Sequence, residues 1–198
     1  MVVVERLAGI ANLFGSSPEK RDALARLLTP ADLPGSGWRK MSEKTWRTGA
    51  KGEQTDWAAR AADAGSLTAF RSLQNRGVRQ WVWSQMTPLV SVADAHAEFA
   101  RIRERGVRNS GAVRVREEKE VAVDLFAGAT RIWAHEQSTV GMIGPGSNKL
   151  IAAVVASTVI VVCSSGSPVV TWNSMAGFVA KLGQRIPADF GKGQSGTK

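Results

Sequence analysis

The stretch LIAAVVASTVIVVC, from Leu150 to Cys163, is the most apolar part of the chain and decides the fold class. It contains no charged residue and is rich in β-branched residues, with five valines, two isoleucines and one threonine. β-Branched side chains favour extended backbone, and a strand covered on both faces lacks the alternation of apolar and polar residues. We therefore expect one central strand over 150–163, buried on both faces of a sheet.

The segments around this strand predict further strands that are joined by turns. We expect Ala129–Ile143 to be a long strand, with Gly144–Asn148 as the turn that leads into the central strand. Leu67–Gln74 and Arg79–Leu89 are expected to form a hairpin, because the Asn75-Arg76-Gly77 sequence between them tolerates positive φ. Hairpin connections of this kind predict an antiparallel sheet.

Helices and outer strands account for the remaining segments. Ser17, Ser91 and Thr171 each precede a stretch with helical spacing of apolar residues, and the hydroxyls of Ser17 and Ser91 are suited to cap helix N-termini. Trp38–Arg47 fits an edge strand, and Val113–Asp124 fits either a hairpin or an extended loop. The predicted fold class is α+β, a single antiparallel sheet flanked by helices in an α/β/α sandwich.

The chain length of 198 residues predicts one domain, over 17–187. Residues 1–16 are expected to form an apolar N-terminal helix, which docks on the domain or on a second copy of the chain to give a homo-oligomer. Residues 188–198 read as a flexible basic tail. The start of the chain lacks the pattern of a secretory signal, and the lone Cys163 suits a reducing compartment, so we expect a cytoplasmic location.

Composition excludes several classes of protein. Hydrophobic residues make up 43 %, which is too high for a disordered chain, and one Cys rules out a disulfide scaffold. The two His and the single Cys are not arranged at metal-ligand spacing, so no metal or cofactor is expected. The chain has no apolar run long enough to span a membrane.

Catalytic motifs are equally weak. The glycine-rich segment 144–149 lacks the Gly-Lys-Ser/Thr of a phosphate-binding loop. Cys163 with His135 as its base is the one nucleophilic pair we consider, on the expectation that their strands are neighbours. Residues on paired strands are often close for no catalytic reason, and we predict that the protein is not an enzyme.

Two strands carry rows of aromatic and polar side chains at alternating positions. Alternation places the members of each row on one face of a sheet. If the two strands are neighbours, the rows form an apolar surface with convergent polar groups, as a ligand site requires; the alternative is a tryptophan core beneath a helix. The candidate ligand-binding residues are Arg79, Trp81, Trp83, Gln85, Arg131, Trp133 and His135.

The chain is basic, with 26 Lys+Arg against 17 Asp+Glu and a net charge of +9. Basic side chains are spread over most elements and are densest over 101–119, which makes binding to nucleic acid or another anionic surface the alternative function. We do not favour nucleic acid, because no motif of the common nucleic-acid folds is present. The candidate basic patch consists of Arg101, Arg103, Arg105, Arg108, Arg114, Arg116 and Lys119.

Short motifs give the chain a family resemblance. Leu27–Pro34, followed by Gly37-Trp38, and the helix that begins near Ala93 resemble an actinobacterial, largely mycobacterial family of sensor-type domains. This family includes the LpqN-like lipoproteins and the extracellular sensor domain of a receptor-type serine/threonine kinase. The resemblance implies a Mog1/PsbP-like fold and a non-enzymatic binding or scaffold module. We therefore predict that the protein recognises a protein partner or a small ligand through its sheet face and loops.

Overall fold

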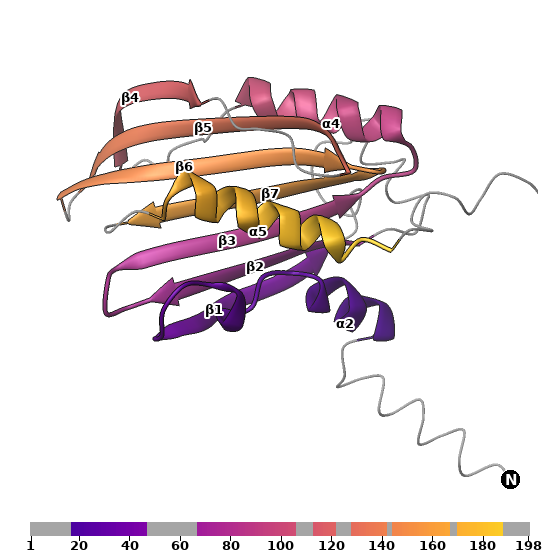
Figure 1. Ribbon diagram of the computed structural model, residues 1–198, viewed down its shortest axis with the longest axis horizontal. Helices are drawn as coiled ribbons and strands as arrows, with labels where there is room; N and C mark the ends of the chain where they lie inside the picture. The colour runs from indigo at the N-terminus through magenta and orange to yellow at the C-terminus, as the bar shows by residue number, and fades with distance from the viewer. Residues whose placement is uncertain are drawn as a thin grey trace, which may run out of the picture.

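The computed structural model describes residues 17–46, 67–105, 113–121, 128–141, 144–166 and 170–187. Figure 1 shows these residues as one sheet with helices on its two faces. The strands are β1 (Trp38–Trp46), β2 (Thr68–Asn75), β3 (Gln80–Pro88), β4 (Val113–Val121), β5 (Ala129–Gly141), β6 (Gly144–Val155) and β7 (Thr158–Gly166).

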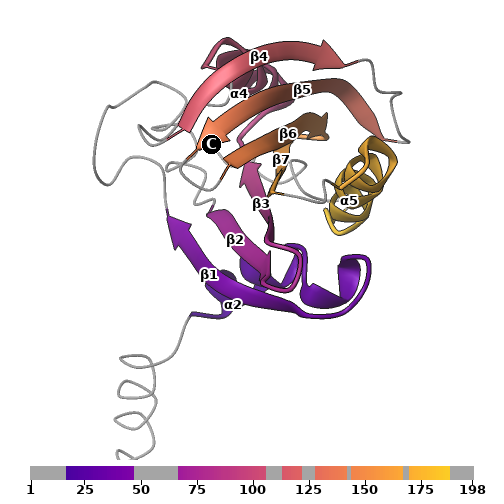
Figure 2. The same cartoon turned by 90° about the vertical axis from the view of Figure 1, so that its left-hand side faces the viewer.

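The strands follow the order β1-β2-β3-β7-β6-β5-β4, and every neighbouring pair is antiparallel. Figure 2 shows this order across the twisted sheet. β7 lies in the middle, and its first seven residues, 158–164, are all buried. The predicted fold class, a single antiparallel sheet flanked by helices, is confirmed.

The stretch 150–163 forms parts of two strands rather than the single strand that we predicted. β6 ends at Val155 and β7 begins at Thr158, so only Ala156 and Ser157 connect them. Ala156 has a φ of 49°, a left-handed conformation that residues other than glycine rarely adopt. The sequence contains neither glycine nor asparagine here, so the usual marker of a tight hairpin is missing.

Two smaller predictions also change. The segment 144–148, predicted as a turn, belongs to β6 and pairs with β5. Within the predicted segment Val113–Asp124, the structure shows one edge strand, β4, with a register shift between Val115 and Glu117. The predicted helix over 1–16 and the predicted tail over 188–198 lie outside the described residues.

Helices cover the sheet on both faces. They are α2 (Pro18–Ala25), the 3-10 turn η1 (Pro30–Asp32), α4 (Val92–Arg105) and α5 (Trp172–Gln184). The predicted caps are confirmed, because the Ser17 hydroxyl accepts a hydrogen bond from the Lys20 amide at 3.3 Å and that of Ser91 accepts one from the Asp94 amide at 3.1 Å.

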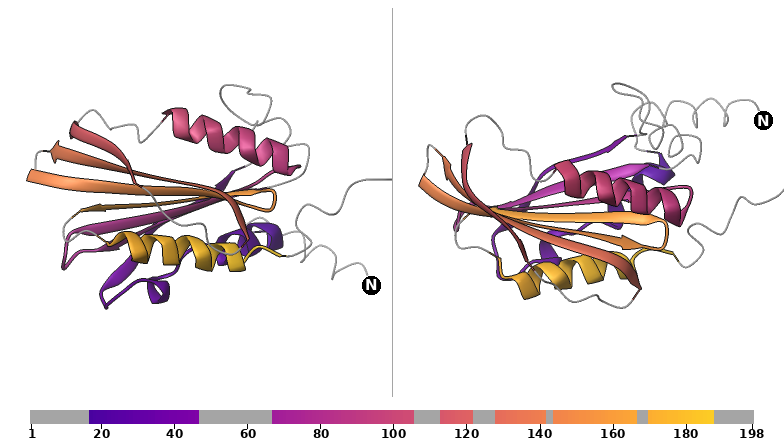
Figure 3. Two further views of the ribbon diagram at one scale, coloured as in Figure 1. Left: turned by 45° about the horizontal axis from the view of Figure 1, so that its top comes forward. Right: turned by 90° about the horizontal axis from the view of Figure 1, so that it is seen from above.

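α4 and α5 pack on opposite faces of the sheet, as both views of Figure 3 show. α5 and the α2 segment cover a core that contains Leu28, Val82, Ile151 and Val162. α4 covers a second, smaller core over β5, β6 and β7, whose buried members are Leu89, Ala95, Phe99, Trp133, Leu150, Ala152, Val154, Val159 and Val161. The sheet is therefore a middle layer between two helical layers.

Arg185 connects the end of α5 to the α2–η1 segment. Its guanidinium donates to the Leu27 carbonyl at 2.8 Å and to the Asp32 carboxylate at 2.7 Å. Asp32 also accepts from the Thr29 amide at 2.8 Å. Burial raises the pKa of Asp32, whereas its hydrogen bonds with Arg185 and Thr29 lower it. The combined lowering is larger than the rise from burial, so the pKa lies below its usual value.

This cluster predicts an acid-dependent loss of stability. A carboxyl with a lowered pKa in the folded state stabilises the protein above its unfolded pKa of about 3.9, and the contribution is lost as the pH falls through the folded value. Asparagine resembles the protonated acid, so we expect Asp32→Asn to be less stable at pH 7 by about 1–2 kcal/mol. The difference should shrink towards zero near pH 3, as measured by urea unfolding. An equal difference at both pH values would contradict this account.

Candidate binding surface

The predicted rows on β3 and β5 share one face of the sheet, but their strands are not neighbours as we expected. The register pairs Trp83 with Cys163, Cys163 with Leu150 and Leu150 with His135. Residues directly opposite one another point to the same face, so these four side chains form a line across four strands. β7 and β6 therefore separate the two candidate rows.

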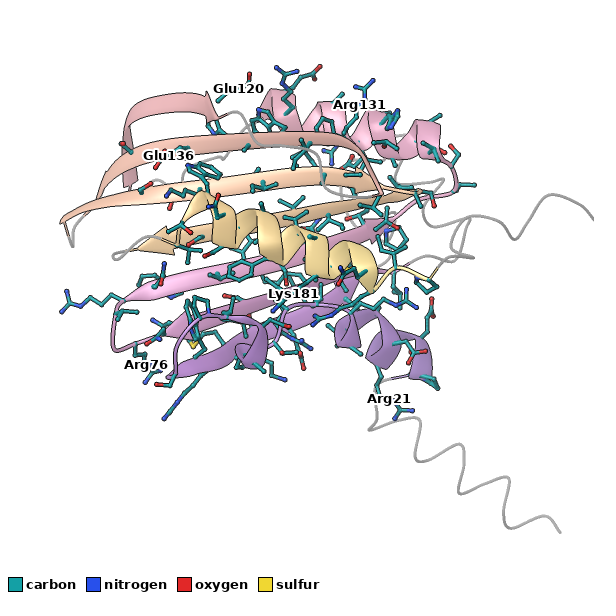
Figure 4. The ribbon with its side chains drawn as sticks, viewed as in Figure 1. Arg21, Arg76, Glu120, Arg131, Glu136 and Lys181 are labelled. Carbon is teal, nitrogen blue, oxygen red and sulfur yellow. The ribbon has the colours of Figure 1, made fainter. Side chains whose placement is uncertain are left out.

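α4 divides the candidate residues into a buried group and a more exposed group. Trp133 and His135 lie in the core beneath α4, where their rings stack with centroids 5.2 Å apart. This half of the predicted site matches the tryptophan-core alternative. Arg79 lies exposed in the turn before β3, and Arg131 is exposed on β5. Figure 4 shows Arg131 on the α4 side of the molecule.

The β3 row lies beside α4 and is half-buried. Trp81, Trp83 and Gln85 each retain partial exposure. The Phe70 ring on β2 lies 5.7 Å from the Trp83 ring, and the Lys44 ammonium on β1 lies 5.2 Å above the Phe70 ring. We call the surface formed by Lys44, Phe70, Trp81, Trp83 and Gln85 the aromatic surface.

The sequence patterns did not point to two members of the aromatic surface, Phe70 and Lys44. Phe70 and Lys44 lie opposite one another in the β1–β2 pairing, and Phe70 lies opposite Gln85 in the β2–β3 pairing. The predicted hairpin already placed Phe70 close to β3, so counting its register could have found Phe70. Placing Lys44 on this surface requires knowing that β1 pairs with β2, and the sequence of the connecting segment 47–66 does not indicate that pairing.

The basic patch is partly neutralised by carboxylates. Arg101 donates to the buried Glu98 carboxylate, with Nε 2.6 Å from Oε2. Arg103 donates through Nε to Glu120 on β4 at 2.9 Å. The side chains of the other five members lie outside the described part of the structure, namely Arg105, Arg108, Arg114, Arg116 and Lys119.

Cys163 and His135 do not lie on neighbouring strands, as the candidate nucleophilic pair was expected to do. β6 lies between their strands, so the two residues are two strand spacings, about 10 Å, apart. Burial raises the pKa of the Cys163 thiol to about 12, and a hydrogen bond with Trp83 offsets this only in part. A thiol in this state is a poor nucleophile.

The described residues contain no group of three or more His, Cys, Asp or Glu placed to hold a metal ion. Among the described helices, none has the length and apolar character needed to cross a membrane.

Comparison with known proteins identifies the fold. No protein-family model matches the chain, and no curated protein matches it. The structure is similar to the crystal structure of the extracellular domain of PknH from Mycobacterium tuberculosis, with a TM-score of 0.55 and 15 % identity over 86 % of this chain and 97 % of that one. This establishes a shared fold and agrees with the predicted resemblance to mycobacterial sensor-type domains.

A weaker likeness, with a TM-score of 0.41 and 12 % identity, covers 82 % of this chain and 96 % of an uncharacterized protein from Mycobacterium smegmatis, an Rv0999 ortholog. At this level the likeness carries no argument about fold or function.

The predicted cytoplasmic location is wrong by this comparison, because the PknH domain that shares the fold is extracellular. Part of that prediction rested on the lone Cys163 as a sign of a reducing compartment. Cys163 is buried within β7, and its raised pKa keeps it in the thiol form. Burial protects such a thiol from oxidation in any compartment, so its presence says little about location.

Proposed function

We propose that the protein is a non-enzymatic binding module that recognises its ligand through the aromatic surface. One observation carries the proposal: Trp81 and Trp83 lie half-buried on the part of the sheet face next to α4, and the Trp83 ring lies 5.7 Å from the Phe70 ring. Trp133, on the same face, is buried beneath that helix. Partly exposed tryptophans with polar neighbours are typical of sites that take an apolar or ring-shaped ligand.

The chemistry of the aromatic surface suggests the form of the ligand. Indole faces stack on planar rings and on the apolar faces of sugar rings, while the Gln85 amide offers hydrogen bonds. The Lys44 ammonium adds a positive charge at one side. We therefore propose a ligand, free or carried by a protein partner, that presents a ring with polar substituents.

The proposed family resemblance supports a binding role. The proposed membership in the LpqN-like group of sensor-type domains rests on the short motifs over 27–38 and near Ala93. The likeness to the extracellular domain of PknH favours a recognition module outside the cytoplasm. The alternative, anionic-surface binding over 101–119, is less favoured because Arg101 and Arg103 already pair with carboxylates.

Indole NMR signals provide the test. We would titrate the protein with a library of aromatic and monosaccharide fragments and follow the 15N–1H signals of the tryptophan side chains. The signals of Trp81 and Trp83 should move on binding, and Trp81→Ala should weaken binding about tenfold. The control is Trp172→Phe on α5, on the opposite face of the sheet, which should leave binding unchanged. Fragments that shift only Trp172 or Trp38, or none that shift Trp81 and Trp83, would refute the proposal.

A further inference from the structure

An open hollow lies at the end of the sheet where β1 begins and the β2–β3 turn protrudes. It has a volume of about 580 Å³, which is within the range of small-molecule sites. Figure 4 labels Arg76 at this end of the molecule, far from Arg21 on α2. The described residues that line the hollow are Ser36, Gly37, Arg39, Asn75, Arg76, Gly77 and Val78.

Asn75 fixes the two walls of the hollow relative to one another. Its side-chain nitrogen donates to the Ser36 carbonyl at 2.7 Å, and its side-chain oxygen accepts from the Gly77 amide at 3.1 Å. Gly37 has a φ of +86°, and a Cβ there would lie 3.3 Å from the Asn75 oxygen. The backbone therefore approaches Asn75 closely, and the hollow is a built feature rather than a gap between loose loops.

The charged side chains that line the hollow are positive. Arg39 and Arg76 are exposed, and neither makes a hydrogen bond or ion pair with another described residue. Arg79, also exposed, follows in the same turn with a φ of 50°. No acidic side chain is found among the described lining residues. Clustered guanidinium groups without carboxylate partners form strong, often bidentate hydrogen bonds with oxyanions.

A buried polar group lies next to the hollow. Gln80 is directly opposite Asn75 in the β2–β3 pairing and is 5 % exposed. Its side-chain nitrogen has no hydrogen-bond partner among the described residues. An unpaired buried donor is costly, so such groups tend to mark a place where a water or ligand is held.

We propose that this hollow binds the phosphate or sulfate ester group of a small molecule, with Arg39 and Arg76 as its principal ligands. Val78, which is 38 % exposed, offers an apolar contact for the organic part of the ester. The lining of the hollow shares no residue with the aromatic surface or the basic patch, so the proposal neither requires nor excludes the proposed function.

The test uses inorganic phosphate, inorganic sulfate and a sugar phosphate as probes at low salt. The backbone amide signals of Gly37 and Gly77 should shift in a saturable manner, and the sugar phosphate should bind more tightly than inorganic phosphate. Arg39→Gln and Arg76→Gln should each weaken binding tenfold or more. Arg21→Gln removes the same charge from α2 and should change the affinity less than twofold.

Two results of these titrations would overturn the proposal. One is that the shifts at Gly37 and Gly77 do not saturate. The other is an equal loss of affinity in all three variants, which would mean that only net charge matters.

A second experiment with vesicles that contain phosphatidylglycerol distinguishes a lipid headgroup from a small-molecule ester. Binding to the sugar phosphate without sedimentation with vesicles is the expected result. Sedimentation with vesicles, but no saturable binding of the sugar phosphate, would contradict a small-molecule site.

Discussion

Gly166→Ala is expected to destabilise the protein by roughly 3 kcal/mol or more. Gly166 ends β7 with a φ of +112°, and a Cβ at this position would lie 2.2 Å from the Arg79 carbonyl oxygen and 3.0 Å from the Gln80 Cα. Both contacts are with backbone atoms, so no side-chain rotation can relieve them. Relief requires the start of β3 to move away from the middle strand of the sheet, with which Gln80 pairs directly.

Urea unfolding followed by tryptophan fluorescence measures this effect. Gly177→Ala is the matched control, because it introduces the same methyl group on an exposed position of α5 where a Cβ would meet nothing within 4 Å. Alanine is the better helix former, so this variant should gain about 0.5–1 kcal/mol. A Gly166→Ala protein within 1 kcal/mol of the wild type would show that β3 and β7 are not held together as tightly as described.

The second large effect concerns the reactivity of Cys163. Alkylation proceeds through the thiolate, and a pKa of about 12 leaves roughly one thiol in ten thousand ionised at pH 8. An ordinary cysteine, with a pKa of about 8.5, is about one quarter ionised at that pH. Together with burial, this predicts that iodoacetamide reacts with native Cys163 at least a thousandfold more slowly than with a cysteine peptide.

Mass spectrometry of the labelled protein measures the rate, and the same chain in concentrated urea is the control. The unfolded chain should react at the rate of the peptide, because the raised pKa depends on burial between β3 and β6. Rapid labelling of the folded protein would show that the middle of the sheet opens readily, and would restore Cys163 as a candidate nucleophile.

Local patterns predicted the elements of the fold well where the physical cause was itself local. The hairpin of β2 and β3 was predicted, although Asn75 belongs to β2 and the positive φ of the turn falls on Arg79. The Ser17 and Ser91 caps form as expected. The α5 residues that face the core are spaced as one helical stripe requires, and all are buried: Met175, Phe178, Val179 and Leu182. In the apolar stretch that follows Ser91, Ala95 and Phe99 are buried, whereas Val92 at the start of α4 is exposed.

The turn at Ala156 and Ser157 could not be predicted from local preference. Both residues adopt other conformations readily, and the flanking strands determine their backbone by pairing over their whole length. The stabilisation from that pairing and from burial exceeds the cost of one left-handed alanine. The run of fourteen uncharged, mostly apolar residues from 150 to 163 is longer than a typical strand, and this length was the one sign in the sequence that two strands were present.

The sequence by itself determined that the protein is an antiparallel α+β domain and which side chains alternate to a common face, because strand period and apolar spacing are properties of the local chain. The tertiary structure decided which rows meet. It placed β7 and β6 between Trp83 and His135, buried Trp133 beneath α4, and brought Phe70 and Lys44 beside Trp83. Strand order and helix docking depend on contacts between distant segments, which alternation along one strand does not encode.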